Sequence, residues 1–213
     1  MTELADLEFL VDELFLESDT PRGQECATQI YLHAYRGADL APYLDRLRAG
    51  SFADQVVSRH VGRALAVWAY LGDDAELVRD LLEGPHALAT LQLDHRTRVG
   101  PGVIREIVRY TESVDGENRH HAFRALGNLA RCGADLGPAV AVLVSELATP
   151  AKGRGYKRFD LGGTARWLLK HVASEGSLVP QVLTELSRVA EGTGKLASAA
   201  RDLRAEIQRG VAP

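Results

Sequence analysis

Aromatic residues, cysteine and long apolar runs are all scarce in this chain, and each scarcity excludes a class of protein. Phe, Tyr and Trp make up only 6% of the 213 residues, which disfavours a sheet-rich fold because strands are enriched in aromatic side chains. Cys26 and Cys132 lie far apart and outside any CxxC or Cys/His cluster. Neither a disulfide framework nor a zinc site is therefore predicted, and both cysteines are expected to be buried free thiols.

No apolar run reaches the roughly 18 to 20 residues that a membrane-spanning helix requires. The first residues, MTELADLEFLVDEL, are acidic, whereas a secretory signal peptide begins with basic residues. We therefore expect no membrane contact and a cytoplasmic location.

What the chain does contain is typical of a globular helical protein. It is 46% hydrophobic and 25% charged, an ordinary balance for a chain that buries a core. The net charge of −4 conceals an asymmetry, because residues 1–21 carry seven acidic residues and no Lys or Arg. The remainder has 25 basic and 22 acidic residues, a charge of +3. An acidic first helix is thus followed by a mildly basic body.

A short turn motif recurs along the chain. GADLAP at 37–42 returns as GADLGP at 133–138, with weaker versions at 72–77 and 176–180, and Gly100-Pro101 begins another apolar helix. The intervals between these turns, 28 to 43 residues, are typical of two-helix repeats. The segment around 85–93 predicts a short first helix in a degenerate third unit.

The glycine of each turn has a predicted structural role. Glycine ends helices in the left-handed conformation, and a following proline fits the first turn of the next helix. We therefore predict a positive φ at Gly37, Gly72 and Gly133.

The helices between these turns resemble HEAT repeats. Residues 118–129, NRHHAFRALGNL, are similar to the first-helix pattern V-R-x-A-A-x-x-A-L-G-x-L, and residues 140–147 are similar to the second helix. The resemblance extends over about residues 22–210 and is weak in the first and third units. It implies an all-α, right-handed α-solenoid of about five helical hairpins, forming a single domain over 1–213. HEAT motifs specify a fold and rarely an activity.

Residues 1–21 are predicted to form an acidic capping helix. Leu4, Leu7, Leu10, Val11 and Leu14 make one apolar stripe within residues 2–17, and acidic residues fill the other face. Terminal repeats need a polar outer side, which is one interpretation of the acidic run. The other is a binding patch for a basic partner.

No motif for catalysis, metal or cofactor binding is present. None of the seven histidines is followed by glutamate, as in the HEAT-like di-iron hydroxylases, and there is no HxxxH or HExxH pattern. Residues 192–195, GTGK, lack the spacing and the Ser or Thr of a phosphate-binding loop, so a helix–helix turn is predicted there. We expect no metal, no cofactor and no catalytic residues.

The stretch 149–163, TPAKGRGYKRFDLGG, is the longest interruption of the repeat pattern. It gathers basic side chains around a tyrosine, namely Lys152, Arg154, Tyr156, Lys157 and Arg158. Such a segment attracts anions and can stack on a planar group. A solvated connector, a contact site for an acidic protein and a nucleic-acid contact are the three interpretations.

The sequence as a whole favours a non-enzymatic protein-interaction module, such as a scaffold, an adaptor or an inhibitor of the bacterial immunity-protein type. It would bind through a concave surface lined by the second helices of the hairpins and through the basic segment at 149–163. The alternative is a nucleic-acid-binding protein similar to the HEAT-like alkylpurine DNA glycosylases. The residues that could line such a DNA groove are Trp68, Trp167, Arg105, Arg109, Arg119 and Arg124. An isoelectric point near 6.0 counts against this alternative, because phosphate binding favours a basic protein.

Overall fold

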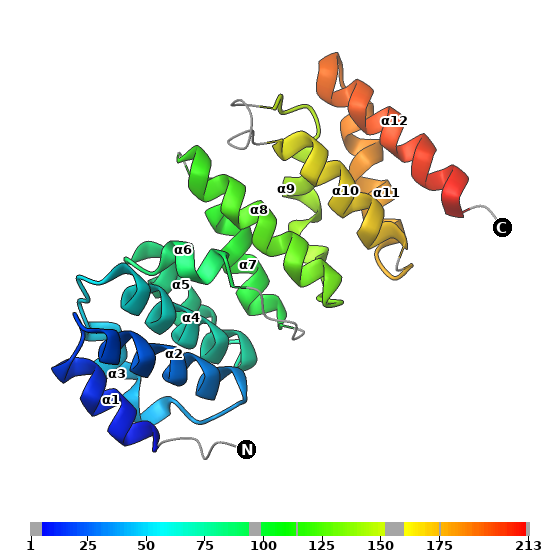
Figure 1. The fold of residues 1–213 in the computed structure, drawn as a ribbon. Helices are drawn as coiled ribbons and strands as arrows, with labels where there is room; N and C mark the ends of the chain where they lie inside the picture. Colours follow the sequence, from blue (N-terminus) through cyan, green and yellow to red (C-terminus); the bar gives the residue numbers. More distant parts are fainter. Residues whose placement is uncertain (1–5, 94–98, 114, 152–159, 175, 212–213) are drawn as a thin grey trace. The chain divides into compact units, whose positions relative to one another are not determined.

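The computed structural model of the protein describes residues 6–93, 99–113, 115–151, 160–174 and 176–211 (Figure 1). Throughout these ranges the regular structure is helical, with no strand, which confirms the all-α prediction. None of the described helices is long and apolar enough to cross a membrane. The chain divides into two compact units, residues 1–97 and 98–213. The prediction of a single domain over 1–213 stays a prediction.

The first unit is organised around α2 and α4, which pack against each other. Helix α1 packs on α2, while α3, α5 and α6 contact α4. The element bounds are α1 Leu7–Leu16, α2 Pro21–Tyr35, the 3₁₀ turn η1 Ala41–Tyr43, α3 Leu44–Ala49, α4 Gln55–Leu71, α5 Ala75–Glu83 and α6 Ala87–Leu91. The short α6 is the abbreviated helix that the sequence predicts around 85–93.

The second unit consists of successive helices that pack in two rows. Helix α10 contacts both α8 and α12, and α9 contacts α11. In addition, α7 packs on α8, α9 on α10 and α11 on α12. The bounds are α7 Pro101–Tyr110, α8 Gly116–Arg131, the 3₁₀ turn η2 Gly137–Ala139, α9 Val140–Ser145, α10 Leu161–Ser174, α11 Val179–Ala190 and α12 Gly194–Val211. Residues 192–193 join two helices, as predicted.

Helix α1 has the amphipathic character that the N-terminal sequence predicts. Leu10, Val11 and Leu14 are buried, while Leu7 is half-buried and Leu4 lies outside the described residues. Phe9 and Leu16 are 49% and 78% exposed, so the outer face is less polar than the acidic composition suggests. Asp6 caps the helix by accepting a hydrogen bond from the Glu8 N–H.

The turn glycines confirm the repeat alignment at two positions and correct it at a third. Gly37 and Gly133 have φ of +84° and +72°. Gly72 has φ of −84°, so a positive φ there was wrong, and Asp73 takes the left-handed conformation instead, with φ of +50°. Aspartate tolerates this region better than most residues other than glycine.

The physical reason is that α4 extends one residue further than α8 relative to this glycine, so that Gly72 is the cap residue and the same hydrogen-bonded turn begins at Asp73. The N–H groups of Gly133 and Ala134 donate to the carbonyls of Ala130 and Leu129. After α4, the N–H groups of Asp73 and Asp74 donate to Tyr70 and Ala69 in the same pattern. The left-handed residue is therefore the one that makes the first of these bonds, whichever side chain it carries.

This difference predicts opposite sensitivities at Gly133 and Gly72. Gly133→Val is expected to lower the free energy of unfolding by about 1 to 2 kcal/mol, because a β-branched residue is strained at positive φ. Gly72→Ala is expected to change stability by less than about 0.5 kcal/mol, since its φ is ordinary and the new Cβ would lie 3.5 Å from the Trp68 carbonyl oxygen. Urea denaturation measures both. Equal losses at the two positions would contradict the assignment.

The two cysteines are not equally buried. Cys26 lies within the core of the first unit, whereas Cys132 is only half-buried at the end of α8. The expectation of a buried thiol is thus confirmed for Cys26 and wrong for Cys132, because the helix ends at Arg131 and the Cys132 side chain belongs to the turn.

Candidate functional site

The basic segment that the sequence singled out lies outside the described residues. This applies to Lys152, Arg154, Tyr156, Lys157 and Arg158. The two other predicted binding residues, Arg105 and Arg109, lie on α7 with exposed side chains. Arg109 forms an ion pair with Glu106 at 3.4 Å. Neither arginine lines the grooves described below.

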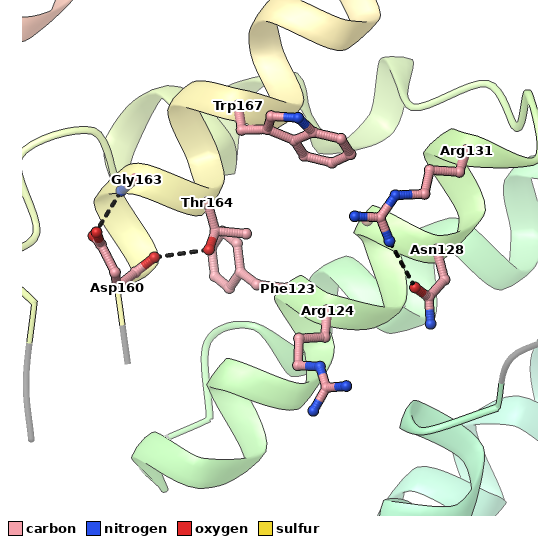
Figure 2. A pocket seen from close by; sticks show the side chains of 9 residues that line it. Phe123, Arg124, Asn128, Arg131, Asp160, Gly163, Thr164 and Trp167 are labelled. Carbon is pink, nitrogen blue, oxygen red and sulfur yellow. Dashed lines mark hydrogen bonds between the residues drawn. The ribbon is translucent and has the colours of Figure 1, made fainter. Parts of the chain in front are cut away.

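A groove of about 650 Å³ lies between α8 and α10, within the second unit (Figure 2). Helix α8 lines one side and the first turns of α10 line the other. The lining residues are Phe123, Arg124, Gly127, Asn128, Arg131, Asp160, Gly163, Thr164 and Trp167. Figure 2 shows the Arg131 guanidinium reaching from α8 toward the Trp167 indole, whereas the Arg124 side chain points away from the indole.

Trp167 is the dominant apolar surface of the groove, and its ring is held from two directions. Its side chain is 41% exposed. The Arg131 guanidinium carbon lies 4.9 Å from the indole centroid, a cation–π geometry. The His171 ring stacks on the indole at 5.3 Å and 8°, and His171 Nε2 lies 3.2 Å from the Ala130 carbonyl oxygen. These contacts position the indole before any ligand arrives.

The floor of the groove depends on the close packing of α8 against α10. Phe123 is 1% exposed, and a Cβ on Gly127 would come within 3.8 Å of the Trp167 ring. At the start of α10, Asp160 Oδ1 accepts a hydrogen bond from the Gly163 N–H at 2.8 Å. A Cβ on Gly163 would lie 2.6 Å from Asp160 Oδ2. The absence of a side chain at position 163 therefore leaves room for the Asp160 carboxylate to cap the start of α10.

The two arginines of the groove carry charges that no described carboxylate neutralises. Arg124 makes neither a hydrogen bond nor an ion pair with any described residue, and Arg131 donates only to Asn128 Oδ1, at 3.3 Å. In contrast, Arg119 on the same helix pairs with Glu146, and Arg166 pairs with Glu206 at 2.7 Å. The groove is thus lined by two arginines that no described carboxylate neutralises, and one of them, Arg131, lies over Trp167.

Two residues of the predicted DNA groove, Arg124 and Trp167, do come together here, whereas others do not. Trp68 lies half-buried in the first unit. Arg119 donates to the Thr111 carbonyl at 2.9 Å as well as to Glu146, so it ties α8 to its neighbours. The sequence reasoning missed Asn128, Arg131, Asp160 and Thr164. Their signal was the shared face of positions 124, 128 and 131 on one helix and of 160, 164 and 167 on the next.

The face formed by the second helices carries a smaller groove. It has a volume of about 290 Å³ and lies between α9 and α11. Its acidic residue, Glu185, is paired with Arg188, and that hydrogen bond lowers the pKa of the Glu185 carboxyl. Charge is compensated on this face, unlike in the α8–α10 groove.

The histidines do not form a metal site among the residues that the structure describes. Nowhere in those ranges do three or more His, Cys, Asp or Glu side chains gather as ligands. His33 and His60 lie in the first unit and His120 and His121 in the second. The His120 and His121 rings meet edge to face at 5.6 Å. The expectation of no bound metal stays a prediction, to be checked by elemental analysis.

Several histidines are buried deeply enough to resist protonation. His86 is 5% exposed and packs against Gly62 of α4, where an added Cβ would lie 2.9 Å from His86 Nδ1. Burial lowers the pKa of His86, although the Ser58 backbone opposes the shift. Burial also lowers the pKa values of His60, His120 and His121, and neighbouring positive charge adds to the effect.

These lowered pKa values predict a loss of stability in mild acid. Below about pH 6.5 the unfolded chain takes up protons that the folded chain refuses, so the free energy of unfolding falls by up to about 1.4 kcal/mol per pH unit for each such histidine. His86→Gln and His86→Leu should both reduce this slope between pH 6.5 and 5.5, whatever they do at pH 7.5. Urea denaturation at these three pH values is the measurement. A slope unchanged in both variants would show that His86 protonates equally in the folded state.

Comparisons with known proteins identify no family for the chain. No family model and no curated protein matches it. Two crystal structures, each titled as an engineered protein from a structural genomics consortium, resemble it in backbone. One is 21% identical, with a TM-score of 0.49, and covers 96% of this chain and 99% of its own. The other is 19% identical, with a TM-score of 0.47, and covers 96% and 97%. The class of the protein therefore follows from its own fold, which is all-α with contacts like those of helical repeats.

Proposed function

We propose that the protein is a non-enzymatic interaction module that binds another protein through the α8–α10 groove. The observation that carries this proposal is the exposed Trp167 with Arg131 over it and Arg124 in the lining of the same groove, where no described carboxylate pairs with either arginine. Tryptophan and arginine are the residues most enriched among the energetic centres of protein interfaces. A scaffold, an adaptor and an inhibitor of the immunity-protein type all fit this format.

A HEAT-like right-handed α-solenoid with α1 as its cap is the architecture that we propose for these hairpins. Its support is the repeated turn geometry after α2, α4 and α8 and the row-by-row packing of α8, α10 and α12. Such folds offer long open surfaces to partners. In this proposal the contact surface lies on α8 and α10, the first helices of their hairpins, rather than on the second helices that the sequence alone suggested.

Nucleic-acid binding is the second candidate function, and the same groove is what favours it. An exposed indole can stack on a base, and arginines can contact phosphates. Asp160 in the same groove and a net charge of −4 oppose a polyanion. The support for an alkylpurine DNA glycosylase is weaker, because Arg105, Arg109 and Trp68 do not line the groove.

Affinity capture with the purified full-length chain from its native organism tests the function. After nuclease treatment, we expect a stoichiometric protein partner whose chemical cross-links map to the second unit. Loss of all bound protein on nuclease treatment would instead establish nucleic acid as the ligand. A variant with Glu at Lys152, Arg154, Lys157 and Arg158 decides whether the basic segment contributes to binding. Its melting temperature should be unchanged, since exposed charges contribute little to stability.

A further inference from the structure

We propose that the ligand of the α8–α10 groove is an acidic segment of the partner protein, in which carboxylate side chains flank an aromatic or bulky apolar one. This inference rests on the proposed function and specifies the chemistry of that same site. It follows from three properties of the groove: the placement of its cations, the state of Trp167 and the position of Asp160.

The two arginines set the spacing of the carboxylates. Arg124 and Arg131 are seven positions apart on one face of α8, which separates their Cα atoms by about 10 Å along the helix axis. A peptide in the polyproline II conformation rises about 3.1 Å per residue with three residues per turn, so it covers this distance in about three residues and returns the third side chain to the same face. Carboxylates three positions apart can therefore each meet one guanidinium, and Arg–carboxylate pairs are favoured by their bidentate geometry.

Arg131 is prepared for such a pair. Its guanidinium lies over Trp167 at 4.9 Å and donates to Asn128 Oδ1 at 3.3 Å. A guanidinium that is already held by a ring and an amide loses less conformational freedom when it binds a carboxylate. The exposed part of the indole is then free to pack against an apolar side chain between the two acids.

Asp160 makes a polypeptide a better occupant than a nucleic acid. Its carboxylate lies at the α10 side of the groove, held by the Gly163 N–H, and would repel a backbone that carries a negative charge at every residue. A peptide can place its acids at α8 and a neutral or basic group near Asp160. The volume of about 650 Å³ accommodates a few side chains and is within the usual range for ligand sites.

The test uses the full chain and a displayed library of random dodecapeptides. Selected sequences are expected to contain Asp or Glu about three positions apart around Phe, Tyr, Trp, Leu or Met. One selected peptide is then synthesised with its acids intact and with each acid changed to the matching amide. Calorimetry with the folded protein should show at least tenfold weaker binding of the amide form, and weaker binding of the acidic form in higher salt.

The variant Arg124→Gln with Arg131→Gln should weaken binding of the acidic peptide at least tenfold, and Trp167→Leu should weaken it as well. Lys195→Gln with Arg209→Gln, which removes the same charge from α12 outside the groove, should leave binding unchanged. Both double variants should keep the wild-type melting temperature, so that loss of binding is not loss of fold.

Five outcomes would overturn the inference. Selected peptides without acidic residues would show that the groove does not recognise carboxylates. Equal binding of the acidic peptide by both double variants would show the same. A single-stranded oligothymidine that binds more tightly than the selected peptide would assign the groove to nucleic acid. Sedimentation showing that the groove is occupied by a second copy of the chain would assign it to self-association. If a captured partner protein still binds the Arg124→Gln/Arg131→Gln variant with full affinity, the inference fails while the interaction function stands.

Discussion

Phe123→Ala is expected to lower the free energy of unfolding of the second unit by about 3 to 5 kcal/mol. Phe123 is 1% exposed and among the largest fully buried side chains of the protein. Truncation removes its burial and leaves a cavity that neighbouring helices fill only in part. Because Phe123 also lines the α8–α10 groove, the same change should weaken peptide binding.

Urea denaturation followed by tryptophan fluorescence measures this effect in the correct unit. In a Trp68→Phe background the signal comes from Trp167, which lies in the second unit. Phe123→Leu serves as the matched control and should cost less than about 1.5 kcal/mol, since it nearly conserves volume and polarity. A loss below about 1 kcal/mol for Phe123→Ala would contradict the packing of α8 described above.

Gly23→Ala is expected to destabilise the first unit by about 3 kcal/mol, at the upper end for overpacking. Gly23 lies in the first turn of α2, where a Cβ would be 2.1 Å from the Glu17 carbonyl oxygen and 2.9 Å from the Ser18 Cα. Both are backbone atoms, which cannot rotate away as a side chain can. The link between α1 and α2 must therefore move, and the Thr20 hydroxyl cap on the Gly23 N–H moves with it.

Gly116→Ala is the control for Gly23→Ala, and its effect should have the opposite sign. Gly116 also begins a helix, but an added Cβ would meet nothing within 4 Å and its φ is ordinary. Alanine should stabilise the protein by about 0.4 to 1 kcal/mol, because it restricts the unfolded chain. For Gly23→Ala the probe is Trp68 in a Trp167→Phe background. A neutral result at Gly23 would mean that α1 does not approach α2 as closely as described.

The turns show how much of the backbone conformation can be predicted from neighbouring residues alone. The recurrence of GAD-type turns correctly placed the left-handed residues at Gly37 and Gly133, since a helix end depends on a few neighbouring residues. The same alignment failed at Gly72 because the hydrogen-bonded turn begins at Asp73. The residues around the turn do not predict whether the glycine or the residue after it takes the left-handed conformation. The packing of the whole helix determines this position.

The ion pairs of the arginines, in contrast, could not be predicted from the sequence. Arg119 and Arg124 are five positions apart on α8 and look equivalent in the sequence, yet Arg119 pairs with Glu146 of the next helical segment while Arg124 has no described partner. The partner of Arg119 is 27 positions away along the chain. Only the tertiary structure determines which arginine stays available for a ligand.

The sequence by itself determined the all-α class, the amphipathic α1, the brief α6, the start of α7 at Pro101 and two of three predicted left-handed glycines. All of these depend on interactions between residues a few positions apart. The tertiary structure alone decided that Arg131 lies over Trp167, although the two are on different helices. It also decided that Asp160 lies in the same groove, between α8 and α10. Side chains distant in sequence meet only when helices dock, and docking depends on the fit of whole faces, which periodicity does not specify.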